Sequence, residues 1–182
     1  MELHRALLTR STVHRYLPEA VPDAVISRAL AAAHQAPNHK LTWPWRFTVV
    51  GPRTRARFMP VAVALKEKKG PLTSTGRALL AEKLLNPALV VVSQRRCDDA
   101  FRAREDYAAS ACAIQNILLS AHADGFGAKW SSGGLTTAAP TYATLGIDPA
   151  VDEIVGFVWI GVPAERPKVP RPPLDGFVRR LD

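Results

Sequence analysis

The chain has 182 residues, and its 24 Lys and Arg exceed its 16 Asp and Glu, which gives a formal net charge of +8. Hydrophobic residues make up 47% and charged residues 22%, a balance that excludes a disordered chain. Apolar runs such as residues 87–92 are too short to cross a bilayer, and the start MELHRALLTR lacks the pattern of a signal peptide. We therefore expect one cytoplasmic domain over residues 1–182, with no membrane partner.

The first half of the chain alternates helical and extended patterns. Residues 2–9 predict a short helix, and a clearer helix opens at Pro22 and Asp23 and is stopped by Pro37. The run RFTVVG predicts a strand over residues 46–51, followed by a helix over about 53–68. Residues 69–75 predict a loop before a short helix that ends near Leu85.

The second half begins with a strand over residues 87–94 that is apolar on both faces, which is typical of a central strand. Residues 103–124 predict the longest helix, and Gly125 and Gly127 end it. A short strand then leads into the turn WSSGG. A helix around residues 137–145 precedes the last strand, residues 153–162, which is again apolar on both faces.

The long helix is unusual because it is apolar almost all round from Ala108 onward. Such a helix must be buried on most sides, by its own domain or by a second subunit. Glu105 and Asp106, which precede this run, are expected to form a charged, solvated first turn. The tail over residues 163–182 is rich in proline and predicts an extended arm that ends in a short helix. Together these elements predict an α+β fold with a small sheet wrapped by helices.

The segment TRSTVHRY over residues 9–16 gathers cations and hydroxyls at a helix end. Arg10, Ser11, Thr12, His14 and Arg15 could surround a phosphate, because the guanidinium fork and the hydroxyls match its oxygens. The alternative is a polar helix C-terminus whose cations complement the helix dipole. The sequence alone leaves both open.

Two loops add weaker signals. APNHK places His39 shortly before Trp43 and Trp45, which could form a platform for a flat ring, although Trp45 also suits the core. In the turn over residues 130–134, glycines would allow a ligand to approach the backbone closely and serines could donate hydrogen bonds. An exposed histidine and an ordinary glycine turn are the plain alternatives.

Other chemistries are disfavoured. Cys97 and Cys112 are too few for a disulfide framework and lack zinc-site spacing, so no metal is expected. The basic residues are scattered and match no nucleic-acid motif, so no nucleic acid is expected. A basic dimer that binds nucleic acid stays an alternative, which predicts salt-dependent binding and no chromophore.

The order and spacing of these motifs resemble the FMN-dependent nitroreductase family, in its small single-domain subgroup with an APNHK-type loop. The resemblance covers nearly the whole length of the chain. The matching stretches are RSTVHRY (10–16), VPDAVISRALAAAHQAPNHK (21–40), PWRFTVV (44–50), AIQNILLSAHADGFGAKWSSG (113–133) and EIVGFVWIGVPAERP (153–167).

The resemblance implies an intertwined homodimer with a nitroreductase-like fold, a mainly antiparallel sheet and two FMN sites at the subunit interface. The implied activity is hydride transfer from NADH or NADPH through FMN to a nitroaromatic, a quinone or a similar acceptor, by a ping-pong mechanism. No side chain of the protein is implied as catalytic. A flavin-binding or flavin-storing dimer without catalysis is the alternative.

The resemblance also implies roles for single residues. Arg10, Ser11 and Thr12 would hold the phosphate and ribityl end, Gln35 and His39 would reach the flavin from the partner chain, and Ser131, Ser132 and Gly133 would lie beside the isoalloxazine. Many relatives have a second arginine at the position of Ser11, which shifts phosphate binding toward Arg10, His14 and Arg171. Leu41 and Trp43 stand where relatives commonly carry amide side chains, so the acceptor is not carried over.

Overall fold

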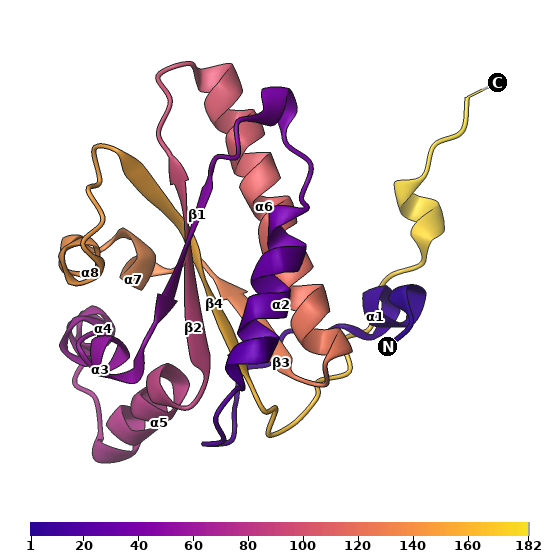
Figure 1. Cartoon of the computed structure of the whole chain (residues 1–182). Coiled ribbons are helices and arrows are strands. Elements are labelled where there is room, and N and C mark those ends of the chain that lie inside the picture. Colours follow the sequence, from indigo (N-terminus) through magenta and orange to yellow (C-terminus); the bar gives the residue numbers. More distant parts are fainter. Residues whose placement is uncertain (182) are drawn as a thin grey trace.

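The computed structural model describes residues 1–181 and has an α+β fold, as the sequence predicts (Figure 1). Four strands form one sheet in the order β1-β2-β4-β3, and every neighbouring pair is antiparallel. In chain order the elements are α1 (Leu3–Thr9), α2 (Asp23–His34), η1 (His39–Leu41), β1 (Trp45–Val50), α3 (Pro52–Ala56), α4 (Met59–Glu67), α5 (Ser74–Leu85), β2 (Ala88–Arg95), α6 (Ala100–Ala123), β3 (Gly127–Ser131), α7 (Gly134–Thr137), α8 (Ala139–Leu145), β4 (Asp152–Gly161) and η2 (Leu174–Phe177).

The two central strands are buried along most of their length, β2 over residues 89–94 and β4 over residues 154–161. Their apolar sequences on both faces therefore reflect helices on both sides of the sheet. Alternate residues divide between the two faces: Val90 packs with α2 and α6, whereas Val91 packs on the opposite side. A register shift between Val92 and Ser93 interrupts the pairing of β2 with β4.

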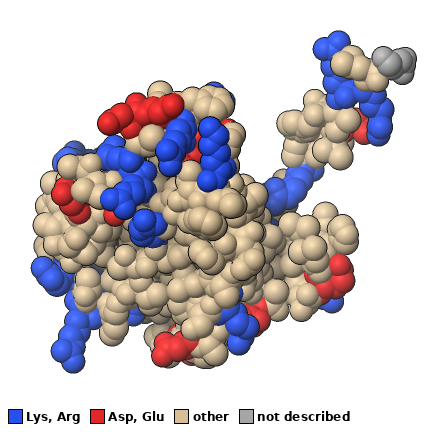
Figure 2. All heavy atoms as spheres, turned by 45° about the horizontal axis from the view of Figure 1, so that its top comes forward, with Lys and Arg blue, Asp and Glu red and all other residues tan. Residues whose placement is uncertain are grey.

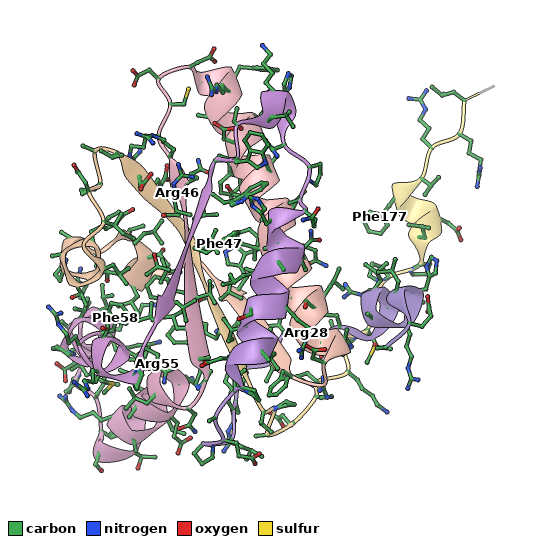
Figure 3. All side chains as sticks on the ribbon, in the orientation of Figure 1. Arg28, Arg46, Phe47, Arg55, Phe58 and Phe177 are labelled. Carbon is green, nitrogen blue, oxygen red and sulfur yellow. The ribbon has the colours of Figure 1, made fainter. Side chains whose placement is uncertain are left out.

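Each face of the sheet has its own hydrophobic cluster. On one face, α2 and α6 lie side by side along the sheet, and Ala113, Ile114 and Ile117 of α6 are fully buried (Figure 1). On the other face, α3, α4 and α5 gather around Phe58, which points toward the sheet in Figure 3 and lies 5.6 Å from Phe157 between ring centroids. The sheet is thus the middle layer between two helical layers.

The long helix α6 starts earlier than expected, at Ala100, because Asp99 caps it. The Asp99 carboxylate accepts hydrogen bonds from the backbone N–H groups of Phe101 and Arg102. Glu105 and Asp106 consequently lie beyond the first turn. One side of α6 faces the core, while the outward side exposes Ala108, Cys112 and Gln115 together with the larger Arg104 and Tyr107.

One expected helix is interrupted. The helix expected over 53–68 is two helices, α3 and α4, with a break at Arg57 and Phe58. Pro60, at the start of α4, lacks the backbone N–H that would continue the ladder, and the break allows Phe58 to turn into the core. The helix expected around 137–145 is confirmed as α8, and the separate short helix α7 precedes it.

The segment between α1 and α2 crosses one end of the sheet. Thr12 forms a parallel bridge to Ala128 of β3, and Tyr16 forms an antiparallel bridge to Pro163. Val13 lies so close to Gly127 that a Cβ atom there would meet the valine side chain at 2.7 Å. Glycine at this position therefore lets residues 10–16 lie flat against the sheet.

After β4 the chain leaves the sheet and runs past α1, so that both termini lie on the same side of the molecule (Figure 1). Phe177 lies on η2, which stands apart from the sheet and its helices (Figure 3), and is 72% exposed. Residue 182, the last of the expected arm, lies outside the described residues. Within the described residues 1–181, no helix combines the length and the apolar character needed to cross a membrane.

Candidate functional site

A cationic cavity of about 360 Å³ lies between the end of α1 and the C-terminal arm. Arg10 and Ser11 line it from one side, and Arg166, Lys168 and Arg171 line it from the other. Among the described residues, four cations and no carboxylate line this cavity. Guanidinium and hydroxyl groups in this arrangement suit a phosphate-like anion.

The crowding of positive charge acts on Arg10 itself. Burial, and then the neighbouring guanidinium of Arg171, lower the pKa of Arg10 from its usual range. An arginine stays protonated despite such a shift, so the cavity keeps its positive potential. An anion between the two guanidinium groups would relieve their repulsion.

Two further cavities lie on the α4–α5 side of the sheet and share Lys66, Leu80, Leu84 and Trp159. One has a volume of about 440 Å³ and is also lined by His14, Lys83 and Lys129. The other has about 360 Å³ and reaches Ser131, Gly133 and Gly134, just after β3. Their walls combine leucine and tryptophan side chains with ammonium groups, which suits a ligand with a flat apolar part and an electron-rich edge.

Lys129 is the half-buried cation among these groups. Burial, then the charges of Lys83 and Lys66, lower the pKa of Lys129 from its usual 10.5. The lysines are close enough to repel one another, and a negative charge in the cavity would be stabilised by all three.

The segment over residues 10–14 connects the cationic cavity to the apolar ones. Arg10 and Ser11 line the former, and His14 lines the latter. At about 3.3 Å per residue, Arg10 and His14 are roughly 13 Å apart along an extended chain. A ligand that occupies both cavities must therefore be elongated, with Thr12 lying between its two ends.

Ser131, Ser132 and Gly133 differ in what they can offer a ligand. The Ser131 hydroxyl accepts a hydrogen bond from the Trp159 indole N–H at 2.9 Å and donates to the Phe157 carbonyl at 3.5 Å. Because that hydroxyl is engaged within the fold, Ser132 and Gly133, which are exposed, are left to face a ligand. A Cβ atom at Gly133 would meet nothing within 4 Å, so the space beside its backbone is open.

Gln35 and His39 lie far from the cationic cavity within one chain. The His39 ring nitrogen Nδ1 lies 2.8 Å from the Glu105 carboxylate, near the start of α6, whereas Thr9 contacts His122 near its end. Between Glu105 and His122, α6 rises about 25 Å at about 1.5 Å per residue. Gln35 is exposed at the C-terminal end of α2.

The expectation that Glu105 and Asp106 form a solvated turn is wrong. Asp106 is only 5% exposed and accepts a 2.7 Å hydrogen bond from the Thr42 hydroxyl. These two carboxylates hold residues 39–43, the segment of η1 and the turn after it, in which Lys40, Leu41 and Trp43 all have positive φ. Non-glycine residues in that region are strained, so the contacts with α6 fix a conformation that the loop alone disfavours.

The structure adds residues that sequence patterns did not single out. Lys66, Lys83 and Lys129 come together only because α4, α5 and β3 pack around one cavity, and the sequence places them far apart. Arg166 likewise reaches the cationic cavity only because the C-terminal arm packs beside the end of α1. Within residues 1–181, His, Cys, Asp and Glu side chains form no group of three that could hold a metal ion.

Charge on the wider surface is dispersed. Figure 2 shows Lys and Arg in separate groups, interspersed with Asp and Glu, and a further basic group on the C-terminal arm. No continuous basic stripe crosses this face, which agrees with the scatter of basic residues in the sequence.

The chain is therefore an α+β protein with an antiparallel sheet between two helical layers, and residues 10–14 run from its cationic cavity to an apolar one. The chain belongs to the nitroreductase family, whose model matches residues 7–162.

Individual relatives agree with this assignment. The proposed NAD(P)H nitroreductase YfhC of Bacillus subtilis (strain 168) is 32% identical over 178 residues, with 92% of this chain and 87% of YfhC covered. A nitroreductase-like family protein from Bacillus cereus has a similar structure, with a TM-score of 0.85, 25% identity and coverage of 100% and 97% of the two chains. A proposed nitroreductase from Desulfovibrio desulfuricans, in complex with FMN, gives a TM-score of 0.79, 24% identity and coverage of 100% and 98%.

Proposed function

We propose that this protein is an FMN-dependent NAD(P)H oxidoreductase that acts as a homodimer. The observation that carries the proposal is the pairing of a carboxylate-free cationic cavity with cation-rimmed apolar cavities along residues 10–14. FMN has the matching shape and charge, a phosphate at one end of a ribityl chain and a flat ring system at the other. The family relationship and the FMN-bound Desulfovibrio desulfuricans structure support the same cofactor.

The residues divide between the two ends of the cofactor. Arg10, Ser11 and Arg171 would hold the phosphate, with Thr12 along the ribityl chain. Ser132 and Gly133 would offer backbone N–H groups to the ring. When bound, FMN supplies electron transfer between NADH or NADPH and an acceptor such as a nitroaromatic or a quinone, in ping-pong fashion.

The lysines would contribute electrostatically. Lys66, Lys83 and Lys129 surround the apolar cavities and would stabilise negative charge that develops on a bound ring. Trp159 lies between the two apolar cavities and fixes Ser131 through its indole N–H. Because Lys129 is half-buried beside this indole and the leucines, its ammonium charge acts more strongly there than at an open surface.

A second chain is needed to complete the site. His39 lies about 25 Å along α6 from the cationic cavity, so one chain cannot bring His39 and Arg10 to the same flavin. The exposed side of α6 includes the small Ala108 and Cys112 beside the larger Tyr107 and Gln115, and another helix could pack on this side. In the homodimer, Gln35 and His39 would therefore serve the partner's flavin.

An anaerobic absorption spectrum tests the proposal. The purified protein should show a flavin spectrum that bleaches on addition of NADPH or NADH and returns on addition of a quinone. A flavin spectrum that neither nucleotide bleaches would favour a flavin-storing dimer, in which the exposed Leu41 and Trp43 block access to the ring. A colourless protein that does not take up added FMN would contradict the proposal and favour the nucleic-acid alternative.

A further inference from the structure

A buried histidine connects three segments beside the cationic cavity. His122, near the end of α6, is 7% exposed. Its Nε2 lies 2.9 Å from the Thr9 hydroxyl of α1, and its Nδ1 lies 3.2 Å from Nη1 of Arg166 on the arm. Arg166 also donates to the Gly125 carbonyl. The chain segments that line the cavity thus meet at one imidazole ring.

The partners determine which ring nitrogen carries the proton. A guanidinium can only donate, so Nδ1 of His122 must accept from Arg166. The neutral ring then carries its hydrogen on Nε2 and donates to the Thr9 hydroxyl. Thr9 in turn donates to the Arg5 carbonyl at 2.6 Å. The hydrogen bonds thus run in one direction: Arg166 donates to His122, His122 donates to Thr9, and Thr9 donates to the Arg5 carbonyl.

The surroundings keep the ring neutral. Burial, then the charges of Arg166 and Arg10, lower the pKa of His122 from 6.5. The other charged pair at this end of α6 is Asp124 with Arg28, whose closest atoms are 2.8 Å apart. A neutral ring is the form that can accept from Arg166, because an imidazolium has no free lone pair.

We propose that His122 is a positioning residue for phosphate binding: its Nδ1 fixes the guanidinium of Arg166 at the wall of the cationic cavity. The inference rests on the proposed function, since it takes the anion in that cavity to be the FMN phosphate. Arg166 lines the cavity together with Arg10 and Arg171. Without an acceptor at Nδ1, the long arginine side chain would lose its fixed orientation and part of its contribution to binding.

The test compares two substitutions at His122 and two ligands. Asn places an amide oxygen at the position of Nδ1, whereas Leu fills the space without an acceptor. His122→Leu should weaken FMN binding about fivefold to tenfold, less than the loss of a hydrogen bond to a charged group because Arg166 itself remains, and His122→Asn should stay within about twofold of the wild type. Riboflavin, which lacks the phosphate, should bind equally to all three proteins. Equal losses for FMN and riboflavin would show a general structural defect and overturn the proposal.

A double-mutant cycle tests whether His122 acts through Arg166. Arg166→Leu should weaken FMN binding, and adding His122→Leu should cost nothing further, because the positioned group is already absent. Additive losses would contradict the proposal. If His122→Leu does not fold, Thr9→Val at the exposed end of α1 removes the acceptor for Nε2–H and should produce a smaller loss that is again specific for FMN.

An NMR titration of the histidine rings separates this inference from the proposed function. In the flavin-free protein, Arg166→Leu should raise the pKa of His122, and an unchanged pKa would overturn the proposed contact. A wild-type protein that binds FMN no better than riboflavin would contradict the phosphate assignment instead.

Discussion

Ser131 shows how the same residue type can serve the fold at one position and a ligand at the next. Its hydroxyl is engaged by Trp159 and Phe157, whereas Ser132 is exposed. A sequence motif such as WSSGG contains no information on this division, because Trp159 lies on the neighbouring strand. The hydrogen-bond partners of each hydroxyl decide it.

Arg10 should be the most sensitive single residue for flavin binding. Arg10→Ala removes a guanidinium from the cationic cavity and should weaken FMN binding about tenfold to a hundredfold, the range for a hydrogen bond to a charged group. The Tm of the flavin-free protein should change little, since Arg10 contributes no core packing. Fluorescence titration with FMN measures the effect, and Arg53→Ala on α3 is the matched control. Equal FMN affinity in Arg10→Ala and the wild type would refute the phosphate assignment.

His122 should make stability depend on pH. Its pKa is lowered in the folded protein, so between that value and 6.5 the unfolded chain binds more protons than the native state. Its contribution to stability is therefore fully present above pH 6.5 and is lost as the pH falls toward the folded pKa. The Tm of the flavin-free wild type should fall more steeply than that of His122→Asn between pH 7 and pH 5. His4→Gln, at an exposed position of α1, should follow the wild type, and parallel curves for His122→Asn and the wild type would contradict this prediction.

At the scale of elements, the crossing of residues 10–16 over the sheet depends on glycine. Gly127→Ala would place a Cβ atom 2.7 Å from Val13, so one of the two segments must move. Overpacking of this kind should lower the free energy of unfolding by about 1–3 kcal/mol, measurable by urea denaturation. Gly51→Ala, where a Cβ atom would meet nothing within 4 Å, should be close to neutral. If both substitutions had the same effect, Val13 would not be the cause.

Whether a segment is a helix or a strand can be predicted from its local sequence pattern, whereas the contacts between helices and strands cannot. The length of apolar runs correctly predicted β1, β2 and β4, a short strand was expected before the WSSGG turn, where β3 lies, and proline and glycine marked the ends of α2 and α6. The break at Phe58 was missed because Pro60 also suits the first turn of a helix, so either one helix or two fitted the pattern. The burial of Asp106 was missed because its partner, Thr42, belongs to a distant loop.

The candidate site likewise contains residues that the sequence grouped correctly and one that it grouped wrongly. Arg10, Ser11 and Thr12 were predicted from adjacent residues at a helix end, and the structure places Arg10 and Ser11 in one cavity with Arg171. His14, grouped with them in the sequence, lines a different cavity because the extended chain carries it about 13 Å further. The roles of these residues toward FMN stay predictions, as do the single-domain organisation and the extended arm over 163–182.

At the scale of the whole molecule, the exposed side of α6 should be the dimer interface. Ala108→Arg would place a second guanidinium one helical turn from Arg104 on this side, so it should shift the protein from dimer to monomer in sedimentation velocity. FMN binding should weaken in parallel, because Gln35 and His39 of a partner would no longer reach the flavin. Ala56→Arg adds the same charge on α3 and should leave the dimer intact. A wild-type protein that is monomeric and still binds FMN would contradict the interface.

The cationic cavity is built from residues 8–11 and 166–171, with the entire sheet between them in the sequence. During synthesis, the first wall exists long before the second, so a nascent chain can fold its sheet and still hold no phosphate. On the proposed function, tight binding of the cofactor would then be a late event in synthesis. Proteolytic loss of the arm after β4 would remove one wall of the cavity and should weaken FMN binding.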